Sequence, residues 1–164
     1  MKKLYMIGGT MGAGKTAVCE ALKQALPRSV FLDGDWCWNA HPFQVTNETK
    51  AMVMENICFL LNQFLRCSAY ENVIFCWVMH EQSIIDAILA GTDRTSCDTK
   101  VISLMCRPDT LRQRLENDVR SGVRTRDVIA RSMERMPLYD MLQTEKIHTD
   151  DISICEIVAR IKTL

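Results

Sequence analysis

The feature that most constrains this chain is a glycine-rich segment near its start, Gly9 to Thr16, which reads GTMGAGKT. The segment fits the pattern G-x-x-x-x-G-K-[ST] without a mismatch. Glycines let the backbone curl with no Cβ in the way, so that a row of N–H groups converges on one anion. Because eight residues can match by chance, the segments on either side decide whether such a loop forms.

Both flanking segments favour the loop. Lys3 to Ile7 is a short apolar run of strand-forming residues, which predicts a buried strand that ends at Gly8. After the loop, apolar residues recur at helical spacing from Val18 to Leu26, which predicts a helix that opens near Lys15. Strand, glycine loop and helix together predict a phosphate-binding loop rather than a glycine turn that binds nothing.

Each residue type in such a loop has an expected task. Lys15 is expected to reach the β- and γ-phosphates of a nucleotide, and the Thr16 hydroxyl is expected to hold Mg²⁺. The free N–H groups at the helix start, together with the helix dipole, favour an anion at the same place. The loop residues predicted to contact the nucleotide are Gly9, Met11, Gly12, Ala13, Gly14, Lys15, Thr16 and Ala17.

Length and charge narrow the class of protein. At 164 residues the chain is expected to form a single domain, residues 1–164. Lys plus Arg equals Asp plus Glu at 20 each, and the isoelectric point is near 6.8. A bulk attraction to nucleic acid or to an anionic membrane is therefore not indicated. The apolar runs are too short for a membrane span or a signal peptide, so we expect a cytoplasmic location.

The eight cysteines include no C-x-x-C pair, so neither a disulfide framework nor a metal site is expected. Four of them lie within apolar segments, where a thiol acts as a small hydrophobic group. These cysteines are Cys58, Cys76, Cys106 and Cys155.

Strand and helix patterns alternate along the rest of the chain. Further strands are predicted at residues 29–32, 73–79, 100–106 and 146–149, and helices at 46–66, 83–90, from 108 onward and after the capping box at 153–156. Five strands that alternate with helices predict an α/β fold with a parallel sheet covered on both faces, which is a three-layer αβα architecture.

Two carboxylates follow the second predicted strand in the step Asp33-Gly34-Asp35. In open α/β sheets ligands bind beyond the carboxyl ends of the strands, so both carboxylates are expected to face the phosphate loop. The alternative is a plain turn, which Asp and Gly also favour. The third strand carries no Asp near its end, so metal binding is expected to depend on Thr16, waters and the Asp33/Asp35 pair, with Thr16 and Asp33 as the candidate metal residues. His80 and Glu81, at the same edge, are candidates either for acceptor contacts or for a local hydrogen bond.

Arginine is concentrated between residues 107 and 135. Eight of the 12 arginines of the chain lie there, and no lysine does. Selective use of Arg indicates bidentate recognition of phosphate or carboxylate, although a solvated helix face accounts for part of the excess. Gly122 should break the helix, and the arginines around it are Arg120, Arg124 and Arg126. Residues from about 118 to 136 are therefore predicted to form a lid that carries arginines to a phosphate.

The phosphate-binding loop, the Asp33-Gly34-Asp35 step and the arginine-rich segment make the chain resemble the small P-loop kinases. This group contains adenylate, shikimate, gluconate and adenylylsulfate kinases and chloramphenicol phosphotransferase. The resemblance covers nearly the whole chain and implies the sheet order 2-3-1-4-5. It also implies ATP and Mg²⁺ as cofactors and a small-molecule phosphoryl acceptor. The oligomeric state is not readable from it.

The resemblance also implies roles for individual residues. Asp35 is the first candidate for the base that contacts the acceptor hydroxyl, and Asp33 is the second candidate, with ordering of a Mg²⁺-bound water as its other role. Lys15 is expected to act in catalysis together with Arg120 and Arg124. Arg126 is expected to bind nucleotide, and Thr149 and Asp150 lie where such kinases contact adenine.

The preferred function is transfer of the γ-phosphoryl group of ATP to a hydroxyl or phosphate of a small molecule. Trp36, Trp38 and Phe43 could line an acceptor pocket that suits a nucleoside, a nucleotide or an antibiotic-like compound, with core packing as the alternative. A GTPase is disfavoured because neither N-K-x-D nor D-x-x-G occurs. A nucleotide-binding module or NTPase without a small-molecule acceptor is the alternative function, and the neutral charge disfavours a polynucleotide kinase.

Overall fold

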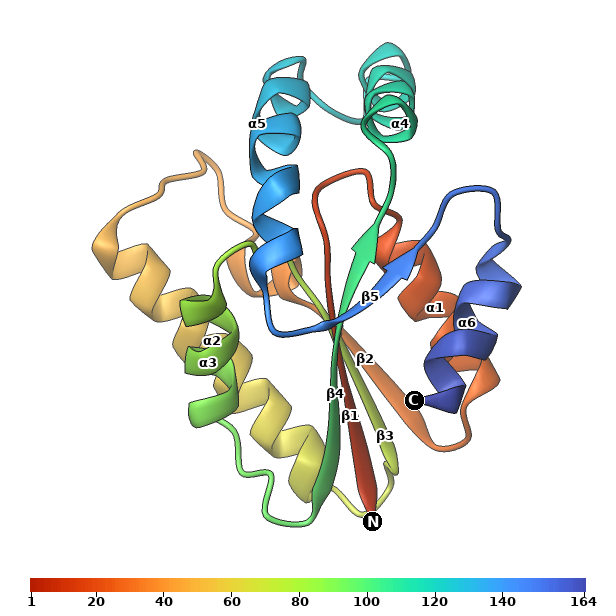
Figure 1. Ribbon diagram of the computed structural model, residues 1–164. Coiled ribbons are helices and arrows are strands. Elements are labelled where there is room, and N and C mark those ends of the chain that lie inside the picture. The colour runs from red at the N-terminus through yellow and green to blue at the C-terminus, as the bar shows by residue number, and fades with distance from the viewer.

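A five-stranded parallel sheet forms the centre of the molecule (Figure 1). The computed structural model covers all 164 residues. The strand order is β2-β3-β1-β4-β5, which confirms the expected order. The strands are β1 (Lys2–Gly8), β2 (Ser29–Asp33), β3 (Asn72–Cys76), β4 (Cys97–Met105) and β5 (Glu145–His148).

Six α-helices and two 3₁₀ helices connect the strands. The α-helices are α1 (Lys15–Ala25), α2 (Asn47–Arg66), α3 (Gln82–Ala90), α4 (Pro108–Arg120), α5 (Asp127–Arg135) and α6 (Ile154–Thr163), and the 3₁₀ helices are η1 (Gly34–Trp38) and η2 (Met136–Met141). Local signals place several of their starts. Thr46 and Ser153 form capping boxes at α2 and α6, and Pro108 opens α4 at a position where its missing N–H is not needed.

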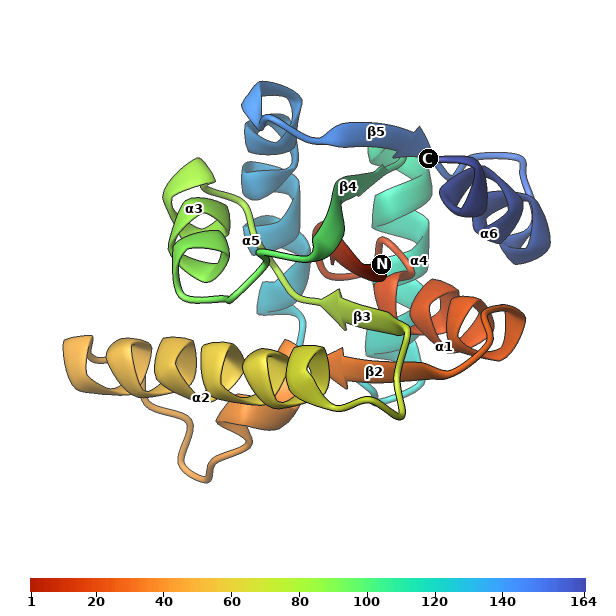
Figure 2. The ribbon, with the colours of Figure 1, turned by 90° about the horizontal axis from the view of Figure 1, so that it is seen from below.

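The helices cover the sheet on two faces (Figure 2). Along β1, Leu4 and Met6 pack with α2 and α3, whereas Tyr5 and Ile7 pack with α1 and α6. Since successive side chains of a strand point to opposite faces, burial on both faces explains why the predicted strands are apolar throughout. The three-layer αβα prediction is confirmed. No helix has both the length and the apolar character needed to cross a membrane.

Three details differ from the expectations. The strand β3 ends at Cys76 instead of Met79. The Trp77 N–H makes the last backbone bond to β1, to Ile7 O at 3.2 Å, and the chain then leaves the sheet. The strand β4 begins at Cys97 instead of residue 100, since backbone pairing with β1 extends into the polar segment before it. Cys155 is exposed on α6 and does not act as a core residue.

The sheet brings the sequence motifs to one edge. Ile7, at the end of β1, and Asp33, at the end of β2, both pair with Cys76 of β3. The Gly9–Gly14 loop, η1 and the segment between α4 and α5 therefore all lie beyond the carboxyl ends of the strands, at the top of Figure 1. Gly34, the first residue of η1, lies so close to Trp77 that a Cβ would fall 2.5 Å from the indole Cγ.

This close approach predicts that Gly34→Ala destabilises the protein by about 1 to 3 kcal/mol, because the indole is fixed near its root and cannot move aside cheaply. Gly8→Ala is the matched control, since its new Cβ would meet nothing nearer than 3.5 Å and its backbone is not left-handed. Denaturant unfolding of both variants measures the difference. Equal stability of the two variants would contradict the packing described.

Candidate active site

The loop between β1 and α1 has the backbone of an anion cradle. Gly9, Gly12 and Gly14 have positive φ angles of 152°, 83° and 90°. Gly12 packs against α4, where a Cβ would lie 2.8 Å from Leu115 Cδ2. Gly14 is the N-cap of α1 and offers no side-chain cap, and the first turn has no acidic residue. The N–H groups at this helix start thus have no side-chain acceptor of their own, and an anion such as a phosphate fits there.

Lys15 is folded back onto the loop. Its ammonium Nζ donates to Gly9 O at 3.0 Å and to Thr10 O at 2.9 Å. Burial lowers the pKa of this ammonium, and the charge of Arg124 lowers it further, while Cys76, Asp35 and Asp33 act in the opposite direction. Because a positive charge held this way is not fully compensated, an anion at the loop would stabilise it. This arrangement fits a bound phosphate group.

The start of α1 is joined to the end of β2 by a hydrogen bond. Thr16 Oγ1 donates to Asp33 Oδ2 at 2.9 Å, and Asp33 Oδ1 accepts from the Asp35 N–H at 3.1 Å. The Asp33 side chain is thus buried and fixed at both oxygens. A hydroxyl and a carboxylate are ligand types that Mg²⁺ prefers, and in such sites waters and phosphate oxygens complete the shell. No cluster of three or more His, Cys, Asp or Glu side chains is present that could hold a metal by itself.

Asp35 lies two residues further out and is exposed. Partial burial of its carboxyl group is the main cause that raises the pKa of Asp35, and the charge of Asp33 adds to this rise. Three causes offset part of this rise in the pKa of Asp35: the charge of Lys15, a hydrogen bond with the Trp77 side chain and the charge of Arg124. A carboxylate with a raised pKa is a stronger base than an ordinary aspartate. Of the two candidate bases, Asp35 is the exposed one, whereas Asp33 is buried with both oxygens hydrogen-bonded.

Trp77 is a site residue that the sequence pattern does not reveal. The apolar run predicts a strand up to Met79, which places Trp77 inside the sheet. In the structure it is the first residue beyond β3, it packs on Gly34 and it contacts Asp35. The sequence alone carries no signal for this strand end, because the apolar run continues to Met79.

The three predicted lid arginines differ in position. Arg124 is half-buried in the turn after α4, the helix that packs on Gly12 of the loop, and its charge lowers the pKa of both Lys15 and Asp35. Arg120 and Arg126 are exposed and form no ion pair. The structure therefore brings Arg124 together with Lys15 and Asp35, and leaves the other two arginines at the surface.

The predicted adenine corner is closed by contacts within the chain. Thr149 is buried, and its N–H and hydroxyl donate to Met105 O at 2.8 and 3.1 Å. The Asp150 carboxylate accepts from the Arg107 N–H at 3.0 and 3.1 Å, which caps the start of α4. Both side chains are engaged in joining β5 to β4 and α4. At this corner of the molecule the Arg107 side chain remains accessible, at 63% exposed, and it pairs with the exposed Asp151 at 2.9 Å.

His80 makes a local contact rather than facing solvent. Its Nε2 lies 3.4 Å from Glu81 Oε1, and its Nδ1 is buried without a partner. Burial lowers the pKa of His80, and the charge of Arg135 lowers it further. The neutral imidazole is therefore favoured at neutral pH. Of the two alternatives considered for His80, the structure contains the local contact with Glu81.

The aromatic residues after Asp35 divide into two kinds. Trp38 packs against the core and lies 4.8 Å from Phe43 between ring centroids. Trp36 and Phe43 are 59% and 58% exposed. Core packing thus describes Trp38, whereas Phe43 and Trp36, whose ring centroid lies 5.3 Å from that of Phe31, present apolar surface to solvent.

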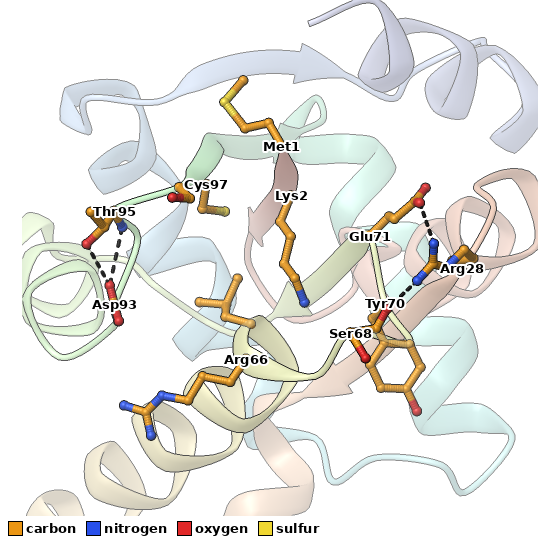
Figure 3. Close-up of a pocket in the computed structure, with 12 residues that line it drawn as sticks. Met1, Lys2, Arg28, Arg66, Ser68, Tyr70, Glu71, Asp93, Thr95 and Cys97 are labelled. Carbon is orange, nitrogen blue, oxygen red and sulfur yellow. Dashed lines mark hydrogen bonds and ion pairs between the residues drawn. The ribbon is translucent and has the colours of Figure 1, made fainter.

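A cavity of about 620 Å³ lies at the opposite, amino-terminal edge of the sheet (Figure 3). Its polar side chains are mostly satisfied within the chain. Lys2 Nζ donates to the carbonyls of Phe64 and Cys67 at the end of α2, and Arg28 bonds the Ser68 and Ala69 carbonyls and Glu71. These contacts fasten the 67–71 turn. The cavity lacks the glycine loop and the clustered free charges of the carboxyl edge, so we place the candidate active site at the carboxyl edge.

Comparisons with known proteins agree with this fold. The model of a family described as AAA domain matches residues 6–137. The comparison with curated proteins gave no match. Among solved structures, the chain is similar to a gluconokinase from Sinorhizobium meliloti 1021, with 18% identity, a TM-score of 0.68 and coverage of 96% of this chain and 87% of that one.

Two further structures are similar over nearly their whole length. The tunicamycin resistance protein of Deinococcus radiodurans has 16% identity, a TM-score of 0.75 and coverage of 99% and 95%. Shikimate kinase from Acinetobacter baumannii, in complex with shikimate, has 20% identity, a TM-score of 0.64 and coverage of 99% and 92%. At these identities the likeness is one of fold, and at that level the predicted resemblance to small P-loop kinases is confirmed.

The contact between Trp77 and Asp35 yields a prediction about titration. A hydrogen bond to the ionised carboxylate lowers its pKa, so Trp77→Phe, which keeps the packing but removes the N–H, should raise the pKa of Asp35 further. NMR titration of the Asp35 carboxyl carbon measures the shift. Trp38→Phe is the control and should leave the titration unchanged. An Asp35 pKa that stays constant or falls in Trp77→Phe would contradict the contact.

Proposed function

Since this chain belongs to the AAA domain family, whose model covers residues 6–137, we propose that it transfers the γ-phosphoryl group of ATP to a small-molecule acceptor. The observation that carries the proposal is the glycine loop at the carboxyl edge of the sheet, which holds Lys15 and is joined through Thr16 to Asp33, with Asp35 and Arg124 close enough for their charges to affect the pKa of Lys15. A cation, a carboxylate of raised pKa and an arginine are the groups that phosphoryl transfer to a hydroxyl requires.

The loop is the donor half of the proposed site. The N–H groups of Gly12 to Thr16 bind the phosphates, and the Lys15 ammonium exchanges the carbonyls of Gly9 and Thr10 for phosphate oxygens. Thr16 and Asp33 would hold Mg²⁺, Thr16 directly and Asp33 through water. Bound Mg²⁺ supplies positive charge to the β- and γ-phosphate oxygens.

Asp35 begins the acceptor half. Its carboxylate receives the proton of the acceptor hydroxyl while the oxygen attacks the γ-phosphorus and the bond to the leaving ADP oxygen breaks. Arg124 and Lys15 stabilise the charge on the transferring group, and one such arginine contributes on the order of 10³ to 10⁵ in rate. Residues 118–136 act as the lid that brings Arg124 in and keeps water out.

The exposed aromatics favour a particular kind of acceptor. Trp36 and Phe43 follow Asp35 within the same loop and offer rings to solvent, with Val45 exposed beside them in the sequence. Large exposed apolar groups next to a reactive carboxylate suit a ligand with a flat or apolar part. A nucleoside, a nucleotide or an antibiotic-like compound fits this surface better than a sugar acid does.

The proposal is tested by measuring ATP-to-ADP turnover with a panel of acceptors. The panel contains nucleosides, nucleotides, tunicamycin, chloramphenicol, aminoglycosides, gluconate and shikimate. We expect one compound to stimulate ADP formation and to gain a phosphoryl group, as checked by mass spectrometry. Lys15→Ala should abolish this transfer without unfolding the protein. Nucleotide binding with a flat response across the panel would instead favour the alternative, a nucleotide-binding module or an NTPase without a small-molecule acceptor.

The two carboxylates should respond differently to amidation. Asp35→Asn is expected to lower kcat by on the order of 10² to 10⁴, with the affinity for ATP nearly unchanged, because it removes the base alone. Asp33→Asn is expected to change chiefly the Mg²⁺ concentration needed for activity and the stability, since it weakens the contacts of Asp33 to Thr16 and to the Asp35 N–H. Steady-state kinetics with calorimetric ATP binding distinguish the two. A larger loss of kcat in Asp33→Asn than in Asp35→Asn would reverse these roles.

A further inference from the structure

The turn between α4 and α5 carries Arg124, and its geometry is organised by one residue, Asp118. Its carbonyl oxygen accepts from the Val123 N–H at 2.9 Å and from the Arg124 N–H at 3.3 Å, and also from the Ser121 hydroxyl at 3.1 Å. Gly122 supplies the left-handed residue that the turn needs, with φ of 75°. The backbone of Asp118 thus sets the path by which the chain reaches Arg124.

The side chain of Asp118 then fixes the direction of the arginine. Arg124 Nε donates to Asp118 Oδ2 at 3.0 Å, and the two side chains are 35% and 36% exposed. This contact uses the Nε edge of the guanidinium, and neither terminal nitrogen of Arg124 bonds to any other group of the chain. The two terminal nitrogens, which carry four N–H donors in one plane, are therefore left free, and paired donors of this kind suit a phosphoryl oxyanion.

The helix that carries Asp118 packs on the phosphate loop, since a Cβ at Gly12 would lie 2.8 Å from Leu115 Cδ2, about one turn before Asp118 in α4. The charge of Arg124 lowers the pKa of both Lys15 and Asp35. Arg124 and Lys15 repel each other when no phosphate lies between them, and the carboxylate of Asp118, bonded to the Arg124 guanidinium, offsets part of this repulsion. We infer that Asp118 is a positioning residue, which holds Arg124 ready for the transferring phosphoryl group; the inference rests on the proposed function.

A second ion pair in the lid shows what is particular about Asp118. Asp127 pairs with Arg131 at 3.0 Å one turn along α5, and these side chains are more exposed, at 62% and 49%. Arg131 alters the pKa of neither Lys15 nor Asp35. Exposed ion pairs contribute little to stability, so neither pair is needed for the fold. The two aspartates are therefore matched in chemistry and differ in whether their arginine faces the centre.

The test compares Asp118→Ala with Asp127→Ala in the transfer reaction. Asp118→Ala should lower kcat by about 10- to 100-fold, the cost of a misplaced catalytic group, with the KM for ATP changed by less than about threefold. Asp127→Ala should change kcat by less than about twofold. Asp118→Asn, which keeps an acceptor oxygen, should recover part of the loss and serves if the alanine variant does not fold. Thermal unfolding of each variant excludes a general loss of structure.

A double-mutant cycle separates positioning from a structural role. When Arg124 is already replaced by Ala, adding Asp118→Ala should cause no further loss of kcat, because the residue acts only through that arginine. Additive losses would overturn the inference, as would equal losses in Asp118→Ala and Asp127→Ala. A faster Asp118→Ala enzyme would also overturn it, since the carboxylate would then hold the arginine back. Absence of transfer by the unaltered protein with every acceptor would reject the proposed function itself, and this inference with it.

Discussion

The hydrogen bond from the Thr16 hydroxyl to the Asp33 carboxylate is the contact on which the geometry of the site depends. At 2.9 Å it joins the first turn of α1 to the end of β2, although β3 separates β2 from β1 in the sheet. No side-chain carboxylate stands at the end of β3 itself, where Cys76 lies. Asp33 is the acidic group that bonds the start of α1 directly, and both of its oxygens are used to hold neighbouring groups in place.

The position of Asp35 depends on this anchor. Because Asp33 caps η1 through the Asp35 N–H, Asp35 leaves the sheet in a fixed direction. The absence of a side chain at Gly34 lets Trp77 approach the same turn from β3. Asp35 is thus supported on one side by packing and surrounded by Lys15 and Arg124 on the other. The pKa of Asp35 is raised and the pKa of Lys15 is lowered, so the charged form of each group is destabilised. Perturbed pKa values of this kind are typical of functional sites.

Much of the fold could be predicted from the sequence because local patterns agree with the global architecture. The glycine loop specifies its own flanking strand and helix, and alternating elements leave few ways to build a parallel sheet. The strand order is implied by the family resemblance. The end of β3 could not be read, because the apolar run continues to Met79 and hydrophobicity does not mark where backbone pairing stops.

The sequence identifies candidate residue types for the site, whereas their arrangement depends on contacts between distant parts of the chain. Arg120, Arg124 and Arg126 flank Gly122. The turn that closes onto Asp118 sets the position of Arg124, and amino-acid composition does not reveal such a turn. Thr149 and Asp150 are predicted to contact nucleotide, but their side chains are engaged by partners more than 40 residues away in the sequence. Long-range contacts of this kind cannot be seen in a single sequence.

The most direct test of the central claim is a crystal structure of the protein with Mg²⁺ and a non-hydrolysable ATP analogue. We predict that Lys15 Nζ leaves the carbonyls of Gly9 and Thr10 for the phosphates. The γ-phosphate should then lie between Arg124 and the Asp35 carboxylate, with Thr16 on the metal. A nucleotide bound elsewhere, or a γ-phosphate beyond the reach of both Arg124 and Asp35, would contradict the assignment of this edge of the sheet as a phosphoryl-transfer site.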